Sequence, residues 1–152
     1  MNQSIASLVQ TLSGLLEKSS IKIALAESCT GGLLAAHLTA QAGSTLWFDR
    51  GFVTYSNASK TESIGVSSSI IEQYGAVSEE VAKAMAQGAL NHSAAKTSIA
   101  ITGIAGPGGS TENKPVGMVC FAWAVQFPGS PALLIASTQI FDGDRQAIRE
   151  HA

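Results

Sequence analysis

A hydroxyl, a thiol and two glycines stand close together in the segment Ala26 to Gly32, which reads AESCTGG. The segment follows an apolar stretch and precedes a helical pattern, so we expect Ser28 at the carboxyl end of a strand, where α/β sheets bind ligands. The N–H groups of Thr30, Gly31 and Gly32 would begin the helix and could hold the oxyanion of an acyl transfer. This arrangement predicts that Ser28 attacks a carbonyl carbon. The alternative is that Ser28 and Thr30 only cap the helix.

A serine nucleophile needs a base, and Lys60 is the residue that we favour. It follows a β-rich segment, and a lysine that is desolvated in a pocket can lose its proton and act as a base. Tyr55 precedes it by five residues. The alternative for Lys60 is a solvated position in the first turn of a helix. A Ser-His-Asp triad is not expected, because an apolar helix face, a helix end and the chain terminus account for the three histidines, His37, His92 and His151.

Other residues compete with this pair or complement it. Cys29 is a second candidate nucleophile, because a helix N-terminus lowers the pKa of a thiol, although the residue beside an exposed nucleophile usually points into the core. Residues 102–109, TGIAGPGG, look like a phosphate cradle but match neither the dinucleotide-binding pattern nor the P-loop. Arg145 and Arg149 share a helix face, where they either clamp a phosphate or complement neighbouring carboxylates.

Alternating helical and strand patterns must position these residues. Apolar residues recur at helical spacing over residues 5–18 and 30–40, and further helices are expected after the N-cap candidates Ser56 or Asn57, Ser67 and Ser78. A last helix is expected to start around Asp144. Strands are expected over residues 21–26, 48–55, 97–102, 116–126 and 132–141. The short link between the last two strands predicts an antiparallel hairpin. We therefore expect a three-layer α/β/α sandwich with a mixed, mostly parallel five-stranded sheet.

Composition indicates one domain over residues 1–152. Only 13% of residues are charged and the net charge is −2, so we expect part of the surface to be buried in a homodimer or higher oligomer. The basic residues are scattered, which argues against nucleic acid as a partner. No secretory signal and no apolar run of membrane-helix length is present, so we expect a cytoplasmic protein without a membrane partner. The two cysteines lack metal-ligand spacing.

Four motifs occur in a fixed order along the chain: AESCTGG, then VTYSNASK, then YGAVSEEVAKAMAQGA, then AITGIAGPGG followed by KPVGMVCFAW. In that order they resemble the CinA C-terminal domain family over about residues 4–149, nearly the whole chain. That family includes stand-alone nicotinamide mononucleotide amidohydrolases. The resemblance implies hydrolysis of the carboxamide of nicotinamide mononucleotide to nicotinate mononucleotide and ammonia, in pyridine nucleotide salvage, without a metal or another cofactor.

The resemblance also implies roles for individual residues. Ser28 is similar to the nucleophile of the family and Lys60 to its base, with Tyr55 and Thr102 orienting them or the substrate. The 5′-phosphate is expected at Gly106, Gly108 and Gly109 of the glycine-rich loop or at Arg145, and Gly103 is a further substrate-binding candidate. Two alternatives stay open: a nucleotide-binding module of this type without turnover, and a Ser/Lys amidase that acts on another amide. The chain ends earlier than family members usually do, so the last helix is expected to be shortened.

Overall fold

A computed structural model describes residues 3–152 and contains every predicted helix and strand, with ends shifted by a few residues. The short helix η1 was not predicted. The elements follow one another as α1 (Ile5–Ser19), β1 (Ile23–Glu27), α2 (Leu33–Thr39), η1 (Ser44–Leu46), β2 (Phe48–Val53), α3 (Asn57–Ile64), α4 (Ser68–Tyr74), α5 (Glu79–Asn91), β3 (Thr97–Gly103), β4 (Met118–Val125), β5 (Leu133–Ile140) and α6 (Arg145–His151).

The sheet has the strand order β2-β1-β3-β4-β5. Strand β1 is parallel to both β2 and β3, whereas β4 is antiparallel to both β3 and β5. The prediction of a mixed five-stranded sheet is confirmed, but the sheet is evenly divided and not mostly parallel. The physical reason lies in residues 104–117, which join β3 to β4 without a helix, whereas parallel neighbours are usually joined by a helical crossover.

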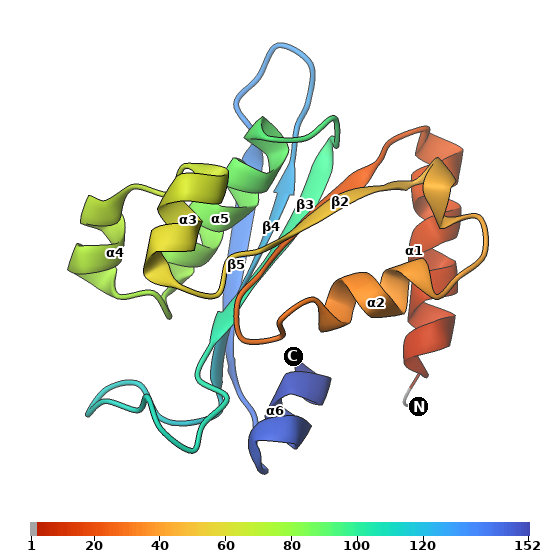
Figure 1. The fold of residues 1–152 in the computed structure, drawn as a ribbon. Helices are drawn as coiled ribbons and strands as arrows, with labels where there is room; N and C mark the ends of the chain where they lie inside the picture. Colours follow the sequence, from red (N-terminus) through yellow and green to blue (C-terminus); the bar gives the residue numbers. More distant parts are fainter. Residues whose placement is uncertain (1–2) are drawn as a thin grey trace.

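Helices cover both faces of the sheet, so the three-layer prediction is confirmed (Figure 1). Helices α3, α4 and α5 lie on one face, and α1 and α2 on the other. The alternation of side chains along β1 explains the two layers: Ala24 and Ala26 belong to the core cluster with α5, and Ile23 and Leu25 to the cluster with α1 and α2. None of the helices described in residues 3–152 is both long and apolar enough to cross a membrane.

The parallel part of the sheet determines where the reactive residues meet. Because β1, β2 and β3 are parallel, the segments that follow their carboxyl ends emerge at the same edge of the sheet. These segments begin with Ser28, Thr54 and Ile104. Helix α6 lies beside this edge (Figure 1), and its buried Ile148 belongs to the same apolar cluster as Ile101 of β3. The candidate site is therefore assembled from loops on a rigid sheet.

Candidate active site

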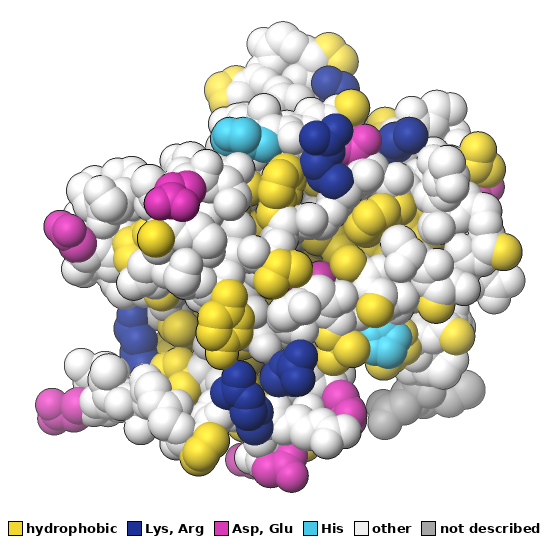
Figure 2. Space-filling view, in the orientation of Figure 1, with side chains coloured by type: hydrophobic (Ala, Val, Ile, Leu, Met, Phe, Trp, Pro, Cys, Tyr) yellow, Lys and Arg dark blue, Asp and Glu magenta, His cyan; other side chains and the backbone are white. Residues whose placement is uncertain are grey.

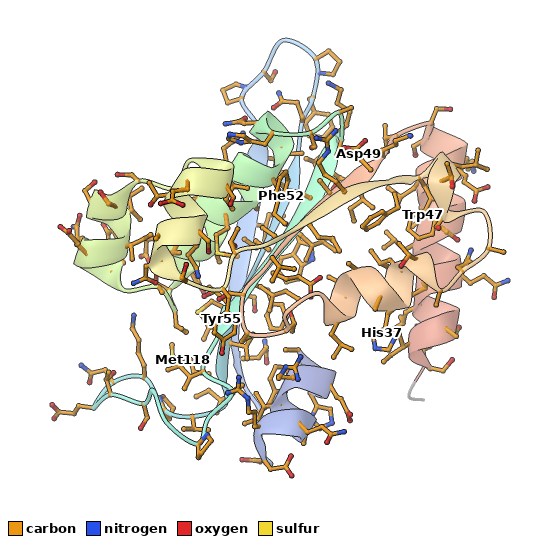
Figure 3. All side chains as sticks on the ribbon, in the orientation of Figure 1. His37, Trp47, Asp49, Phe52, Tyr55 and Met118 are labelled. Atoms are coloured by element: carbon orange, nitrogen blue, oxygen red, sulfur yellow. The ribbon has the colours of Figure 1, made fainter. Side chains whose placement is uncertain are left out.

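A cavity of about 290 Å³ lies at this edge of the sheet. It is lined by most of the predicted site residues, namely Ser28, Tyr55, Lys60, Thr102, Gly103, Gly106, Gly108, Gly109 and Arg145, together with Cys29. Figure 3 shows Tyr55 just beyond the end of β2, between the sheet and α6. The loop after α4 also reaches the cavity through Ala76 and Val77, which the sequence reasoning missed. These two residues lie within the motif YGAVSEEVAKAMAQGA, so this motif could have pointed to them as site residues.

Ser28 and Lys60 contact each other inside this cavity. Lys60 Nζ lies 3.1 Å from Ser28 Oγ, 2.8 Å from the Thr54 carbonyl oxygen and 3.3 Å from the Tyr55 carbonyl oxygen. The Ser28 hydroxyl can donate to the same Tyr55 carbonyl at 3.4 Å. Helix α3 begins after Ser56, whose side chain caps it, so Lys60 stands near the end of the first turn and points inward. Only 1% of Lys60 is exposed, so a solvated lysine is excluded.

Burial changes the protonation of this lysine. Desolvation lowers the pKa of Lys60 from 10.5 to about 8, and no carboxylate in the described part of the chain forms an ion pair with it that would raise the pKa again. About one tenth of the side chain is therefore unprotonated at pH 7. The two carbonyl oxygens can only accept hydrogen bonds, so they take the two hydrogens of the neutral amine. Its lone pair then faces Ser28.

Glu27, and not Ser28, satisfies the start of helix α2. The Glu27 carboxylate accepts the N–H groups of Leu34 and Ala35, each at 3.0 Å, and the Thr30 hydroxyl at 2.6 Å. The capping alternative for Ser28 and Thr30 is therefore wrong, because their hydroxyls bond to other groups. The role of Glu27 was missed in the sequence, although a carboxylate that ends an apolar strand was a usable signal.

The predicted oxyanion site at the helix start does not form as expected. Thr30, Gly31 and Gly32 do not line the cavity, and the Gly31 N–H donates to the Ser28 carbonyl at 3.0 Å. Gly31 and Gly32 both have positive φ angles, 59° and 101°, so these glycines serve the tight turn rather than a ligand. Helix α2 begins only at Leu33, which moves its first N–H groups away from Ser28.

Cys29 is a wall of the cavity and a poor nucleophile. Its side chain belongs to the apolar cluster that contains Ile101 and Phe121, and burial raises the pKa of the thiol to about 11. Near neutral pH the thiol stays protonated, whereas the Ser28 hydroxyl lies in contact with the Lys60 amine. A Cβ at Gly103 would lie 3.0 Å from Cys29 Sγ, so the end of β3 has no room for a side chain.

The two arginines of α6 hold two different segments. Arg145 donates to the Gly106 carbonyl at 2.7 Å and to the Tyr55 hydroxyl at 3.0 Å, so it joins the glycine-rich loop to the segment after β2. Arg149 donates to the carbonyls of Cys29 and Thr30 at 3.0 and 3.1 Å, which fixes the turn that follows Ser28. Neither forms a salt bridge within the described residues. Figure 2 shows basic side chains gathered over α6 on this face.

Thr102 and the histidines have structural contacts. The Thr102 hydroxyl donates to the Ala76 carbonyl at 2.8 Å and thereby holds the loop after α4 against β3. His92 Nδ1 lies 2.8 Å from the Gly88 carbonyl oxygen, and His37 and His151 border a separate apolar groove between α1, α2 and α6. No histidine lines the cavity. Residues 3–152 contain no group of three His, Cys, Asp or Glu side chains arranged to hold a metal ion.

Comparisons with known proteins show which family and which solved structures this chain resembles. The sequence model of the CinA C-terminal domain matches residues 5–152. Nicotinamide-nucleotide amidohydrolase PncC of Enterobacter agglomerans is 52% identical over 130 residues, which are 86% of this chain and 77% of that protein. A CinA-like protein of Mycolicibacterium paratuberculosis is 54% identical over 86% of this chain, which spans only 30% of that longer protein. The crystal structure of a CinA superfamily protein from Enterobacter cloacae has a TM-score of 0.91 at 34% identity, with 99% of this chain and 86% of that chain covered.

Replacing Glu27 tests the support of the nucleophile turn. We expect Glu27→Gln to lower the free energy of unfolding by about 2 to 4 kcal/mol, because a buried N–H group would face an amide that cannot accept it. Chemical denaturation measures the loss, and faster amide hydrogen exchange at Leu34 and Ala35 locates it. Glu72→Gln on the exposed face of α4 is the matched control and should change stability by less than about 0.5 kcal/mol. Equal stability of both variants would contradict the cap.

Proposed function

The chain belongs to the CinA C-terminal domain family, and we propose that it hydrolyses the carboxamide of nicotinamide mononucleotide to nicotinate mononucleotide and ammonia. The observation that carries the proposal is the 3.1 Å contact between Lys60 Nζ and Ser28 Oγ in a cavity at the ligand-binding edge of the sheet. The relative from E. agglomerans is named for this class of reaction. We place the reaction in pyridine nucleotide salvage in the cytoplasm.

The first half of the reaction transfers the acyl group to Ser28. With Lys60 unprotonated, the Ser28 hydroxyl turns its hydrogen from the Tyr55 carbonyl to Nζ, and Oγ attacks the amide carbon. A C–O bond forms and the serine proton moves to Lys60. The C–N bond then breaks as the Lys60 ammonium gives this proton to the departing nitrogen, and ammonia leaves. An ester of Ser28 remains, and Lys60 is neutral again.

Water completes the reaction by the same route in reverse. Lys60 takes a proton from water as its oxygen attacks the ester carbon, and it then returns a proton to Ser28 Oγ. Both tetrahedral intermediates carry an oxyanion that needs N–H donors. The N–H groups of Ser28 and Ile104 are already bonded to the carbonyls of Ile101 and Met118. We therefore assign the oxyanion to the N–H of Cys29 or to those of the glycine-rich loop, instead of the helix start.

The substrate phosphate fits the end of the cavity that Arg145 and the glycine-rich loop share. Arg145 uses two of its five N–H donors on Gly106 and Tyr55, so further donors are left for a phosphate oxygen. Gly106 and Gly109 have positive φ angles, 79° and 91°, which only glycine adopts easily, and a Cβ at Gly106 would clash with Val116. Tyr55 and Thr102 act here as positioning residues through their contacts with Arg145 and Ala76.

Replacing either partner of the Ser28–Lys60 pair should abolish turnover. We expect kcat for ammonia release from nicotinamide mononucleotide to fall at least about 1,000-fold in Ser28→Ala and at least about 100-fold in Lys60→Met. Ser63→Ala and Lys96→Met are matched controls at exposed positions and should keep the wild-type rate. Equal rates in all five proteins would refute the mechanism. Binding of the mononucleotide without any product in the wild type would instead support a module without turnover.

The pH dependence follows from the pKa of Lys60 near 8. The unprotonated amine is the active form, so kcat/KM should rise with pH and level off above about pH 9. Between pH 8 and 10.5 the unfolded chain binds more protons than the folded chain, so the free energy of unfolding should rise with pH by roughly 3 kcal/mol relative to Lys60→Met. A rate profile flat from pH 6 to 9, together with no such rise, is incompatible with the proposal.

A substrate series tests the phosphate site and the alternative amidase. Arg145→Met should raise KM for nicotinamide mononucleotide about 10- to 100-fold and leave the slow hydrolysis of nicotinamide riboside nearly unchanged. Arg50→Met is the matched control, since the neighbouring Asp49 lies at the far end of β2 from Tyr55 (Figure 3). If wild type prefers the riboside or free nicotinamide, the substrate is a different amide. If Arg145→Met weakens riboside and mononucleotide equally, Arg145 does not read the phosphate.

A further inference from the structure

A single group serves as the proton acceptor in the cavity of Ser28 and Lys60. The described lining residues with titratable side chains are Cys29, Tyr55, Lys60 and Arg145. Burial raises the pKa of the Cys29 thiol to about 11, an arginine keeps its proton, and the Tyr55 hydroxyl is bonded to Arg145 at 3.0 Å. Of these four, Lys60 alone is bonded to Ser28 Oγ. A nucleophile that attacks an ester of Ser28 therefore gives its proton to Lys60.

The position of Lys60 suits a nitrogen nucleophile as well as water. In the proposed reaction the departing ammonia takes its proton from Lys60, so a nitrogen atom already occupies the place beside Nζ. By microscopic reversibility, a nitrogen nucleophile that gives a proton to Lys60 follows the same path in the opposite direction. The Tyr55 carbonyl oxygen lies 3.4 Å from Ser28 Oγ and 3.3 Å from Lys60 Nζ, so it is an acceptor for a second hydrogen on that nitrogen.

The charge of the cavity favours neutral nucleophiles. Arg145 lines it, and none of the described lining residues is an aspartate or a glutamate. Glu27 precedes Ser28, but it is only 1% exposed, and its carboxylate accepts the Thr30 hydroxyl and two N–H groups of α2. The lining therefore repels the ammonium ions that alkylamines form near neutral pH. Weakly basic amines such as hydroxylamine remain largely neutral at that pH and are not repelled.

Space limits the size of the nucleophile. The cavity measures about 290 Å³, and the end of β3 closes one side of it, because a Cβ at Gly103 would lie 2.8 Å from Val119 and 3.0 Å from Cys29. The departing ammonia vacates the place of one non-hydrogen atom, and a water molecule takes about 30 Å³ in the liquid. We therefore expect amines of about two or three non-hydrogen atoms to fit beside the bound acyl group.

We propose that the site also transfers the pyridine-carbonyl group of nicotinamide mononucleotide to small, weakly basic amines, which compete with water for the ester of Ser28. The proposal rests on the hydrolysis proposed above. With hydroxylamine, the nitrogen attacks the ester carbon, a C–N bond forms and one N–H proton moves to Lys60. The bond from this carbon to Ser28 Oγ then breaks, and Oγ takes the proton from Lys60. The products are ammonia, from the first half of the reaction, and a hydroxamate of the mononucleotide. No atom is oxidised or reduced.

The distribution of products in hydroxylamine tests the transfer. In about 0.5 M hydroxylamine at pH 7.5, wild type should convert at least about one tenth of the nicotinamide mononucleotide consumed into hydroxamate, measured by mass spectrometry. The ratio of hydroxamate to nicotinate mononucleotide should rise in proportion to the hydroxylamine concentration. Ser63→Ala is the matched control at an exposed position and should give the wild-type ratio. Ser28→Ala should give no hydroxamate above the level without enzyme, which excludes direct attack of hydroxylamine on the amide.

Methylamine tests the selection by charge, because nearly all of it is an ammonium ion at this pH. At equal concentration it should give at least about 10-fold less substituted amide than hydroxylamine gives hydroxamate. Equal yields would overturn the selection for weakly basic amines. Ammonia release with nicotinate mononucleotide as the sole other product in hydroxylamine would overturn the transfer and leave the hydrolysis intact. If no mixture releases ammonia, both the hydrolysis and the transfer are wrong.

Discussion

The burial of one amine beside one hydroxyl, with no carboxylate to balance it, is the constraint on which the site depends. Burying a charged lysine in this environment costs free energy. The same desolvation lowers the pKa of Lys60, so its neutral form is populated near physiological pH. The structure accepts the lysine by giving Nζ two backbone carbonyls, from Thr54 and Tyr55. An acidic partner would have been a stronger stabiliser, but it would have raised the pKa of Lys60 and kept the amine charged near neutral pH.

The surrounding elements hold Lys60 Nζ and Ser28 Oγ close together without placing a carboxylate beside the Lys60 amine. The parallel arrangement of β1 and β2 brings the segments of Ser28 and Lys60 together, and a helix cap at Ser56 sets the direction of Lys60. The negative charge nearest in sequence to Ser28 is that of Glu27, and it is taken up by the N–H groups of α2 and the hydroxyl of Thr30. A carboxylate is thereby placed next to the nucleophile in sequence while its hydrogen-bonding capacity is used elsewhere.

The sequence was sufficient for most of the architecture because local patterns determine it. The apolar run of β1 and the N-cap residues Ser56 and Ser78 act within a few residues, so they could be predicted directly. The orientation of β4 could not be read from local patterns, because it depends on how residues 104–117 cross the sheet. Ser28 and Lys60 were predicted from their residue types and from the resemblance to the CinA C-terminal domain family. The oxyanion site expected at Thr30, Gly31 and Gly32 could not be predicted correctly, because α2 begins at Leu33, later than the sequence pattern indicated.

The contact of Arg149 with the carbonyls of Cys29 and Thr30 joins two parts of the chain that are made at different times. Protein synthesis delivers the strand and turn around Ser28 early, and α6 emerges from the ribosome after every other helix and strand described here. During translation the turn around Ser28 therefore lacks the contacts that α6 supplies in the folded chain. The turn around Ser28 reaches the geometry described here only after residues 145–151 have left the exit tunnel.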